Sequence, residues 1–210
     1  EPMTEAKTDT REIIRVIVPV YRASEVTARC LESVVAALHF YPLSEVLVVD
    51  NGGNNQLAKL LSPLPVKVIS RIAKASAAYA RNSGAADFYE GILVFIDSDV
   101  ICEPDCIKNL VAPLLECRAD ACTGNYSTNL KHLSFTQQYK QLYIHHSYSR
   151  SGDEIRNEFW TALSAVKASA FHSLGGFDES FRGAAGEDTD FGVRLTRNGY
   201  KICFVKNAMG

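Results

Sequence analysis

Two clusters of acidic residues could perform chemistry in this chain of 210 residues. Asp97 and Asp99 flank Ser98 and follow the apolar segment 92–96 directly. Two carboxylates at this spacing can offer hard oxygen ligands to one Mg²⁺ or Mn²⁺ ion, which completes its shell with phosphate oxygens and water. The alternative is an Asx turn, in which the carboxylates only accept backbone N–H groups. A position at the end of a central strand favours the metal site.

The second cluster places Glu187, Asp188 and Asp190 at the start of an expected helix, after the segment 183–186. Acids in the first turn of a helix complement its dipole, so a purely structural role is open. The sharper interpretation is that crowded carboxylates separate their pKa values, which leaves one of them as a general base. The sequence alone favours neither of these two interpretations.

Alternating strands and helices must position these acids. Segment 13–21 is a nearly continuous β-branched run, which is typical of a strand buried on both faces. Apolar residues then recur at helical spacing over 24–38. Further strands are expected at 45–49, 66–69 and 92–96, with helices at 57–61 and 76–88. This alternation predicts right-handed βαβ units and a parallel sheet of the nucleotide-binding type.

The second half of the chain has a weaker pattern. Helices are expected at 105–117, 167–174 and 188–198, and strands at 159–166 and 200–205. Segment 131–150 is rich in Tyr, His, Gln and Ser without a clean period, which leaves open a helix at the sheet edge or a substrate loop. Residues 1–12 are expected to be a flexible segment and residues 13–210 a single domain.

Composition argues against several classes of protein. A net charge of −2 and a pI near 6.2 give no polycationic surface, so nucleic acid is not an expected partner. No apolar run is long enough for a transmembrane helix, and residues 1–12 lack the apolar core of a secretory signal. The six cysteines lack zinc-ligand spacing and mostly occupy apolar positions, which favours a reducing, cytoplasmic location.

Polar residues lie at the carboxyl ends of three of the expected strands. Tyr21 ends the first of these strands, and Asp50 and the turn 97–99 come directly after two others. Because ligands bind beyond the carboxyl ends of the strands in open α/β sheets, we expect these residues to share one site.

The order of short motifs resembles glycosyltransferase family 2, an inverting group with the GT-A fold. The matching segments are Val18 to Tyr21, Val48 to Gly52, Ala80 to Gly84, Asp97 to Asp99, Gly175 to Glu179 and Gly186 to Asp190. Their joint order over residues 13–205 is specific, although each motif alone is weak. The resemblance implies an α/β GT-A fold, a Rossmann-like α/β/α sandwich with a mostly parallel central sheet.

The resemblance also implies an activity, which is sugar transfer from a nucleoside-diphosphate sugar to a hydroxyl of a saccharide or lipid-linked acceptor. A UDP-sugar is the favoured donor. Residues 13–100 would form the donor half of the domain and 101–210 the acceptor half, with a C-terminal segment absent. Regions outside the chain would provide peripheral association with the cytoplasmic face of a membrane.

The resemblance assigns the donor residues one by one. Tyr21 would stack on the nucleotide base and Asp50 would hydrogen-bond to it, in a pocket that also contains Pro19, Arg81 and Ser98. Asp97 would face the ribose or the metal. Asp99 would hold the Mn²⁺ or Mg²⁺ ion that bridges the diphosphate.

The acceptor side has three assigned residues. Asp188, with Glu187 beside it, would deprotonate the attacking hydroxyl. Trp160 could be a platform for an acceptor sugar, although a lone Trp more often belongs to a core or an interface. This chain departs from the family pattern at Asn51, where a second acid is usual, and at Lys74–Ser76, where a Gly is usual.

Three alternatives remain. A phosphotransfer fold of the haloacid-dehalogenase type normally opens its chain with the Asp-x-Asp motif, whereas Asp97 follows three strand-helix units. A dinucleotide oxidoreductase lacks support because no Gly-x-Gly-x-x-Gly follows a strand. A domain derived from a glycosyltransferase that binds a nucleotide sugar or a partner without turnover is the alternative that the motifs leave open.

Overall fold

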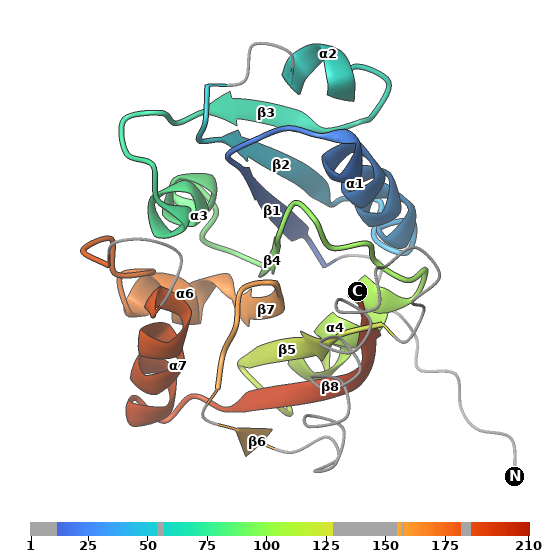
Figure 1. The fold of residues 1–210 in the computed structure, drawn as a ribbon. Coiled ribbons are helices and arrows are strands. Elements are labelled where there is room, and N and C mark those ends of the chain that lie inside the picture. The colour runs from blue at the N-terminus through green and yellow to red at the C-terminus, as the bar shows by residue number, and fades with distance from the viewer. Residues whose placement is uncertain (1–11, 54–56, 128–154, 157, 182–185) are drawn as a thin grey trace, which may run out of the picture.

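The fold is described from a computed structural model, which covers residues 12–53, 57–127, 155–156, 158–181 and 186–210. Within these residues eight strands form one sheet in the order β3-β2-β1-β4-β7-β5-β8-β6 (Figure 1). The strands are β1 (Ile14–Val20), β2 (Glu45–Asp50), β3 (Lys67–Ser70), β4 (Ile92–Ile96), β5 (Ala121–Asn125), β6 (Ile155–Arg156), β7 (Leu163–Lys167) and β8 (Ile202–Met209). The helices are α1 (Glu25–Ala37), α2 (Leu57–Leu61), α3 (Ala77–Ala85), α4 (Cys106–Leu115), α6 (Ala168–Ser173) and α7 (Glu187–Arg197).

The first four strands form the parallel part of the sheet. β1 pairs with β2 and with β4, and β2 pairs with β3, all in parallel. Parallel neighbours need a crossover connection, which α1, α2 and α3 supply. Every residue of β4 is buried, as its continuous apolar run predicts. The predicted βαβ layer is therefore confirmed.

The other part of the sheet is mixed. β7 pairs antiparallel with β4 and with β5, β5 pairs parallel with β8, and β6 pairs antiparallel with β8. Among the described strands, parallel pairs outnumber antiparallel ones, so a mostly parallel sheet is confirmed. β5 and β6 were not predicted. The strand expected at 159–166 begins only at Leu163, which leaves Trp160 in the preceding loop.

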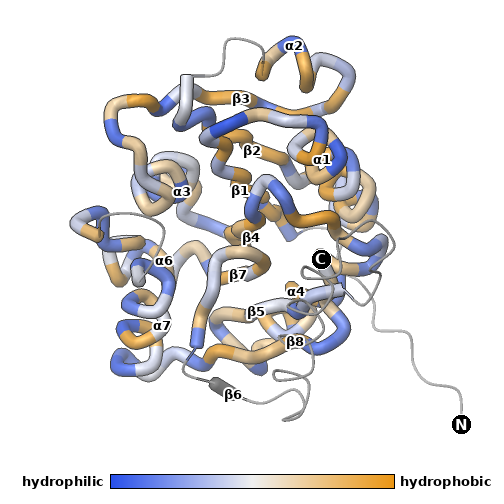
Figure 2. Tube along the Cα trace, in the orientation of Figure 1, coloured by the Kyte–Doolittle hydropathy of each residue, from blue (hydrophilic) through white to orange (hydrophobic). Residues whose placement is uncertain are grey.

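Helices cover both faces of the sheet. α1 and α4 lie on one face, and α3, α6 and α7 lie on the other, with the apolar strands between the two layers (Figures 1 and 2). Each face has its own core: Leu31 and Ile107 belong to the first, and Phe171 and Phe191 to the second. Burial of these two apolar layers is the main force that holds the helices on the sheet.

Two predictions fall on residues outside the described part of the chain. They are the flexible N-terminal segment, of which residues 1–11 are not described, and the helix or substrate loop at 131–150. The helices that are described include none that is long and apolar enough to cross a membrane.

Candidate active site

The carboxyl ends of β1 and β2 bring Tyr21 and Asp50 to one edge of the sheet. Val20 is in register with Asp50, and the Asn51 N–H donates to the Val20 carbonyl at 2.9 Å. A Cβ atom on Gly52 would lie only 1.7 Å from the Tyr21 carbonyl oxygen, so the two main chains approach too closely for any other residue. The Tyr21 side chain is 56% exposed beside this contact. Pro19 lies half-buried in β1.

Asp50 is buried, and one of its oxygens already has a donor. The Gly52 N–H donates to Asp50 Oδ1 at 3.1 Å, which is the Asx-turn contact that a short acidic side chain makes with the chain two residues later. The turn therefore fixes the orientation of the carboxylate at the end of β2.

Asn51 provides a structural reason for the departure from the family pattern. Its amide nitrogen donates to the Lys74 carbonyl at 2.7 Å and also to the Arg71 carbonyl, and its oxygen accepts the Ser76 N–H at 3.0 Å. A carboxylate accepts hydrogen bonds and cannot make the two donations. Asn51 thus ties the end of β2 to the loop that leads into α3.

The Asp97–Asp99 turn follows β4 at the same edge of the sheet. The Asp97 N–H donates to the Ala162 carbonyl at 3.1 Å, and the Asp97 carbonyl accepts the Val100 N–H at 3.1 Å. Asp97 and Ser98 are half-buried, and Asp99 is exposed. The backbone of the turn is therefore held on both sides, while the Asp99 carboxylate faces solvent.

A buried thiol forms a hydrogen bond with the main chain of this turn. Cys30 of α1 donates from its Sγ atom to the Asp97 carbonyl at 3.5 Å. Burial raises the pKa of the Cys30 thiol well above its usual range, and the negative charge of Asp99 acts in the same direction. The thiol therefore stays protonated and keeps its donor role.

Arg81 joins the turn to the start of α7. Its Nη2 atom lies 2.7 Å from Asp97 Oδ1, and its Nη1 atom lies 3.0 Å from Glu187 Oε1. Arg81 is 4% exposed and Glu187 is 5% exposed, so the ion pair between them is buried. Three predicted site residues, from α3, the turn after β4 and the start of α7, therefore meet in what we call the Asp97–Arg81–Glu187 triad.

The three acids of α7 have different surroundings. Glu187 belongs to the triad, and Asp190 pairs with Arg194 at 2.7 Å one turn later. Asp188 is half-buried, and its Oδ1 accepts the Thr189 N–H at 2.7 Å. No cationic side chain of the described residues forms an ion pair with it. Asp188 is thus the member of the cluster whose charge is balanced least by its surroundings.

Sequence reasoning did not anticipate the role of Asn82, the residue after Arg81. Its side-chain oxygen accepts the Phe177 N–H at 2.9 Å, and its nitrogen donates to the Phe177 carbonyl at 2.8 Å and to Glu179 Oε1 at 2.9 Å. Gly176 has a φ of +73°, and a Cβ there would lie 2.7 Å from Asn82 Oδ1. The Gly-Gly-Phe-Asp-Glu segment is thus fixed against α3.

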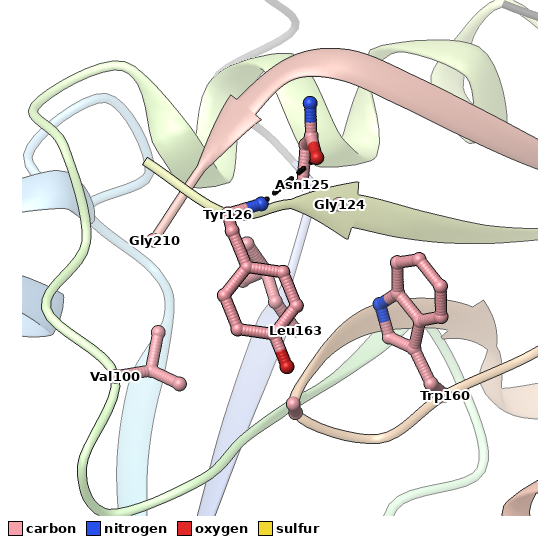
Figure 3. Close-up of a pocket in the computed structure, with 8 residues that line it drawn as sticks. Val100, Gly124, Asn125, Tyr126, Trp160, Leu163 and Gly210 are labelled. Carbon is pink, nitrogen blue, oxygen red and sulfur yellow. Dashed lines mark hydrogen bonds between the residues drawn. The ribbon is translucent and has the colours of Figure 1, made fainter. Parts of the chain in front are cut away.

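Trp160 lines a hollow beside the same turn (Figure 3). The hollow has a volume of about 220 Å³, including open solvent, and Val100 from the end of the turn forms one side. The rings of Trp160 and Tyr126 both border it. Trp160 packs edge-on against Phe204, with the two ring centroids 6.2 Å apart. Tyr126 was not predicted as a site residue because it follows β5, which the sequence does not signal.

The acidic residues of the turn could supply only some of the ligands in the coordination shell of a divalent cation. Among the described residues, no three His, Cys, Asp or Glu side chains are grouped so that they could hold a metal ion by themselves. Asp97 and Asp99 offer hard oxygen donors, and a bound diphosphate could supply the remaining oxygens. This donor set suits Mg²⁺ or Mn²⁺ that arrives with a phosphate ligand.

Comparison with known proteins identifies the family of this chain. The profile of glycosyl transferase family 2 matches residues 15–175, and that of the N-terminal domain of galactosyltransferase matches residues 144–210. Glycosyltransferase GlyA of Streptococcus pneumoniae serotype 4 is 29% identical over 136 residues, which are 63% of this chain and 18% of that protein. Glycosyltransferase AglE of Haloferax volcanii is 24% identical over 208 residues, which are 97% of this chain and 67% of that protein.

Solved structures agree on the fold. The mannosyltransferase PcManGT from Pyrobaculum calidifontis, in complex with GDP-Man and Mn²⁺, superposes with a TM-score of 0.73 at 20% identity, over 100% of this chain and 59% of that one. GalNAc-T7 with UDP, GalNAc and Mn²⁺ gives a TM-score of 0.67 at 16% identity, over 93% and 42%. This chain thus spans less than two thirds of either structure. With a profile match over residues 15–175, the chain belongs to glycosyl transferase family 2 and has the GT-A fold.

Proposed function

We propose that this chain is the catalytic domain of an inverting glycosyltransferase, which transfers a sugar from a nucleoside-diphosphate sugar to an acceptor hydroxyl. The observation that carries the proposal is the Asp97–Arg81–Glu187 triad, because it joins the strand-end turn to the helix that carries Asp188. A cation-binding turn and a candidate base thus belong to one connected site. Residues 13–100 form its donor half and 101–210 its acceptor half.

The donor nucleotide binds at the edge formed by β1 and β2. Tyr21 stacks on the base and the buried Asp50 hydrogen-bonds to it, with Pro19 holding the end of β1 in place. A UDP-sugar is our favoured donor. The solved relatives contain GDP-Man in one case and UDP with GalNAc in another, so both nucleotides belong in the first assay.

The diphosphate binds at the 97–99 turn. Asp99 and Asp97 would hold a Mn²⁺ or Mg²⁺ ion, and Ser98, which lies between them in the sequence, would contribute to donor binding. When bound there, the ion would stabilise the negative charge that develops on the leaving nucleoside diphosphate. Asp99 is exposed and so open to a cation, whereas the half-buried Asp97 is also held by Arg81.

Asp188 is the general base. Its carboxylate removes the proton from the acceptor hydroxyl, and the acceptor oxygen then attacks the anomeric carbon on the face opposite the diphosphate. The bond to the diphosphate oxygen breaks as the new glycosidic bond forms, which inverts the anomeric centre. The half-buried position of Asp188 and the absence of an ion-pair partner among the described residues support this role over Glu187 and Asp190.

The acceptor is a saccharide or a lipid-linked saccharide, and the hollow beside Trp160 supports a sugar ring as its contacting group. Aromatic faces pack well on the apolar C–H surface of sugars. Free cysteines, buried at positions such as Cys30 and Cys122, support a reducing compartment. We place the domain in the cytoplasm, with any contact to a membrane face made by regions outside this chain.

A transfer assay with UDP- and GDP-sugars tests this function on the wild type and on Asp188→Asn. The variant keeps the contact with Thr189 and removes the basic oxygen, so we expect retained binding of the nucleoside diphosphate and loss of turnover. Wild-type protein that binds a nucleotide sugar but transfers nothing to water or to any saccharide would instead identify a binding domain. Equal turnover by both proteins would exclude Asp188 as the base.

A further inference from the structure

The Asp97–Arg81–Glu187 triad contains two carboxylates and one guanidinium group. The guanidinium is delocalised, so its single positive charge is shared between Asp97 Oδ1 and Glu187 Oε1. Glu187 is buried, whereas the Asp97 side chain is 37% exposed. The negative charge in excess therefore lies at Asp97, on the side of the triad that faces solvent.

We propose that Glu187 is a positioning residue for the cation site: by holding one end of Arg81, it balances the guanidinium charge and leaves Asp97 able to bind a divalent ion. The inference rests on the proposed function. It assigns Glu187 a role different from that of Asp188, its neighbour in the sequence. Without Glu187, the full charge of Arg81 would act on Asp97 from 2.7 Å and oppose a cation there.

The geometry allows a clean substitution. Glu187 Oε1 accepts from Arg81, while Glu187 Oε2 is buried without a hydrogen-bond partner among the described residues. In Glu187→Gln the amide oxygen can keep the contact with Arg81, and the amide nitrogen takes the place of the unbonded oxygen. The variant thus removes a charge while it preserves the shape and the contact.

The matched control is Asp120→Asn. Asp120 pairs with Lys167 at 3.0 Å, the same separation as between Arg81 and Glu187. It precedes β5 and so lies at the edge of the sheet opposite the Asp97 turn, because β4 and β5 are both antiparallel to β7. This variant also removes one acid from an ion pair, far from the cation site.

The experiment titrates Mn²⁺ in the presence of UDP or GDP, each at one fixed concentration in excess over the protein. It measures the Mn²⁺ concentration that gives half of the maximal rise in the melting temperature. For Glu187→Gln we expect this concentration to rise about tenfold, and for Asp120→Asn we expect it to stay at the wild-type value. In the double variant Arg81→Gln with Glu187→Gln, the opposing charge is gone, so the concentration should return close to the wild-type value.

Equal Mn²⁺ requirements for Glu187→Gln and wild type would overturn the inference, and so would a double variant that is weaker than Glu187→Gln alone. If Glu187→Gln fails to fold by circular dichroism, the double variant carries the test, and a requirement about tenfold above wild type would count against the inference. If wild-type protein shows no Mn²⁺-dependent shift with either nucleotide, the proposed function fails and this inference fails with it.

Discussion

The side-chain amide of Asn82 bonds to both main-chain polar groups of Phe177, accepting from its N–H at 2.9 Å and donating to its carbonyl at 2.8 Å. This pair connects α3, which carries Arg81, to the segment that leads from α6 towards α7. Glu187 begins α7, directly after that segment, so the Asn82–Phe177 contact helps to set the spacing of the triad.

Asn82→Ala should therefore destabilise the fold. The substitution leaves the Phe177 N–H and carbonyl without their partner, which costs about 2–4 kcal/mol for two main-chain groups. Urea unfolding of wild type and variant measures this difference. Asn109→Ala is the control, because Asn109 makes one exposed bond to the Asn207 carbonyl and its loss should cost less than about 1 kcal/mol. Similar losses in both variants would contradict the proposed importance of the Asn82 contact.

Gly52→Ala should be severely destabilising. Its Cβ would lie 1.7 Å from the Tyr21 carbonyl oxygen, so the carboxyl ends of β1 and β2 would have to separate. Gly53→Ala provides the comparison. Gly53 has a φ of +69°, and a Cβ there would make only an ordinary contact with Ile72 at 3.7 Å. Gly53→Ala should therefore lower the unfolding free energy by only about 1–2 kcal/mol, the cost of a left-handed backbone at a residue with a side chain. We expect Gly52→Ala to unfold at a clearly lower urea concentration than Gly53→Ala; the reverse order would contradict the close approach.

Acid should weaken the parallel part of the sheet through Arg15. The Arg15 side chain bonds to Asp87 and holds the pKa of that carboxyl below its usual 3.8. Burial raises the pKa of Glu45, but the hydrogen bonds from Lys67 and Arg15 outweigh it and hold the pKa below the usual 4.5. Both depressed pKa values mean that this stabilisation is present above about pH 4.5 and is lost as the pH falls through the folded-state values.

Arg15→Gln tests this account through urea unfolding between pH 3 and pH 7. We expect a lower unfolding free energy at pH 7 and a weaker loss of stability on acidification than in the wild type. An unchanged slope below pH 4.5 would show that Arg15 does not set the acid response.

Much of the fold was predictable because β1, β2 and β4, the central strands of the parallel part, are nearly continuous apolar runs. β4 was placed at Ile92–Ile96 from its composition alone, and Tyr21, Asp50 and Asp97 lie at one edge because parallel strands end together. β5 could not be recognised because Ala, Gly and Asn, three of its five residues, are depleted in strands. It is a strand because β7 and β8 pair with it on both sides.

The candidate site was predictable in membership but not in its contacts. Arg81 and Glu187 are 106 residues apart in the chain, and no local pattern predicts that they pair. From the sequence, Glu187 and Asp188 were expected to act as one catalytic pair. Their surroundings differ because neighbouring residues on a helix point in different directions, so that Glu187 is buried and Asp188 is half-buried.

Asp188→Asn should lower kcat by about 10² to 10⁴ and leave the affinity for the nucleoside diphosphate near the wild-type value. The reason is that a missing general base affects proton removal and not donor binding. Transfer kinetics and nucleotide titration on the same preparation separate the two effects. Loss of nucleotide affinity equal to the loss of kcat would place Asp188 in donor binding.

The central claim is that the 97–99 turn binds a diphosphate through a divalent cation. The most direct measurement is a thermal shift with UDP and GDP in Mn²⁺, Mg²⁺ or EDTA, on the wild type and on Asp99→Asn, whose side chain is exposed and not needed for packing. We expect one nucleotide to raise the melting temperature of the wild type only when the cation is present, and the shift to disappear in Asp99→Asn. An equal shift in EDTA, or an undiminished shift in Asp99→Asn, would contradict the claim.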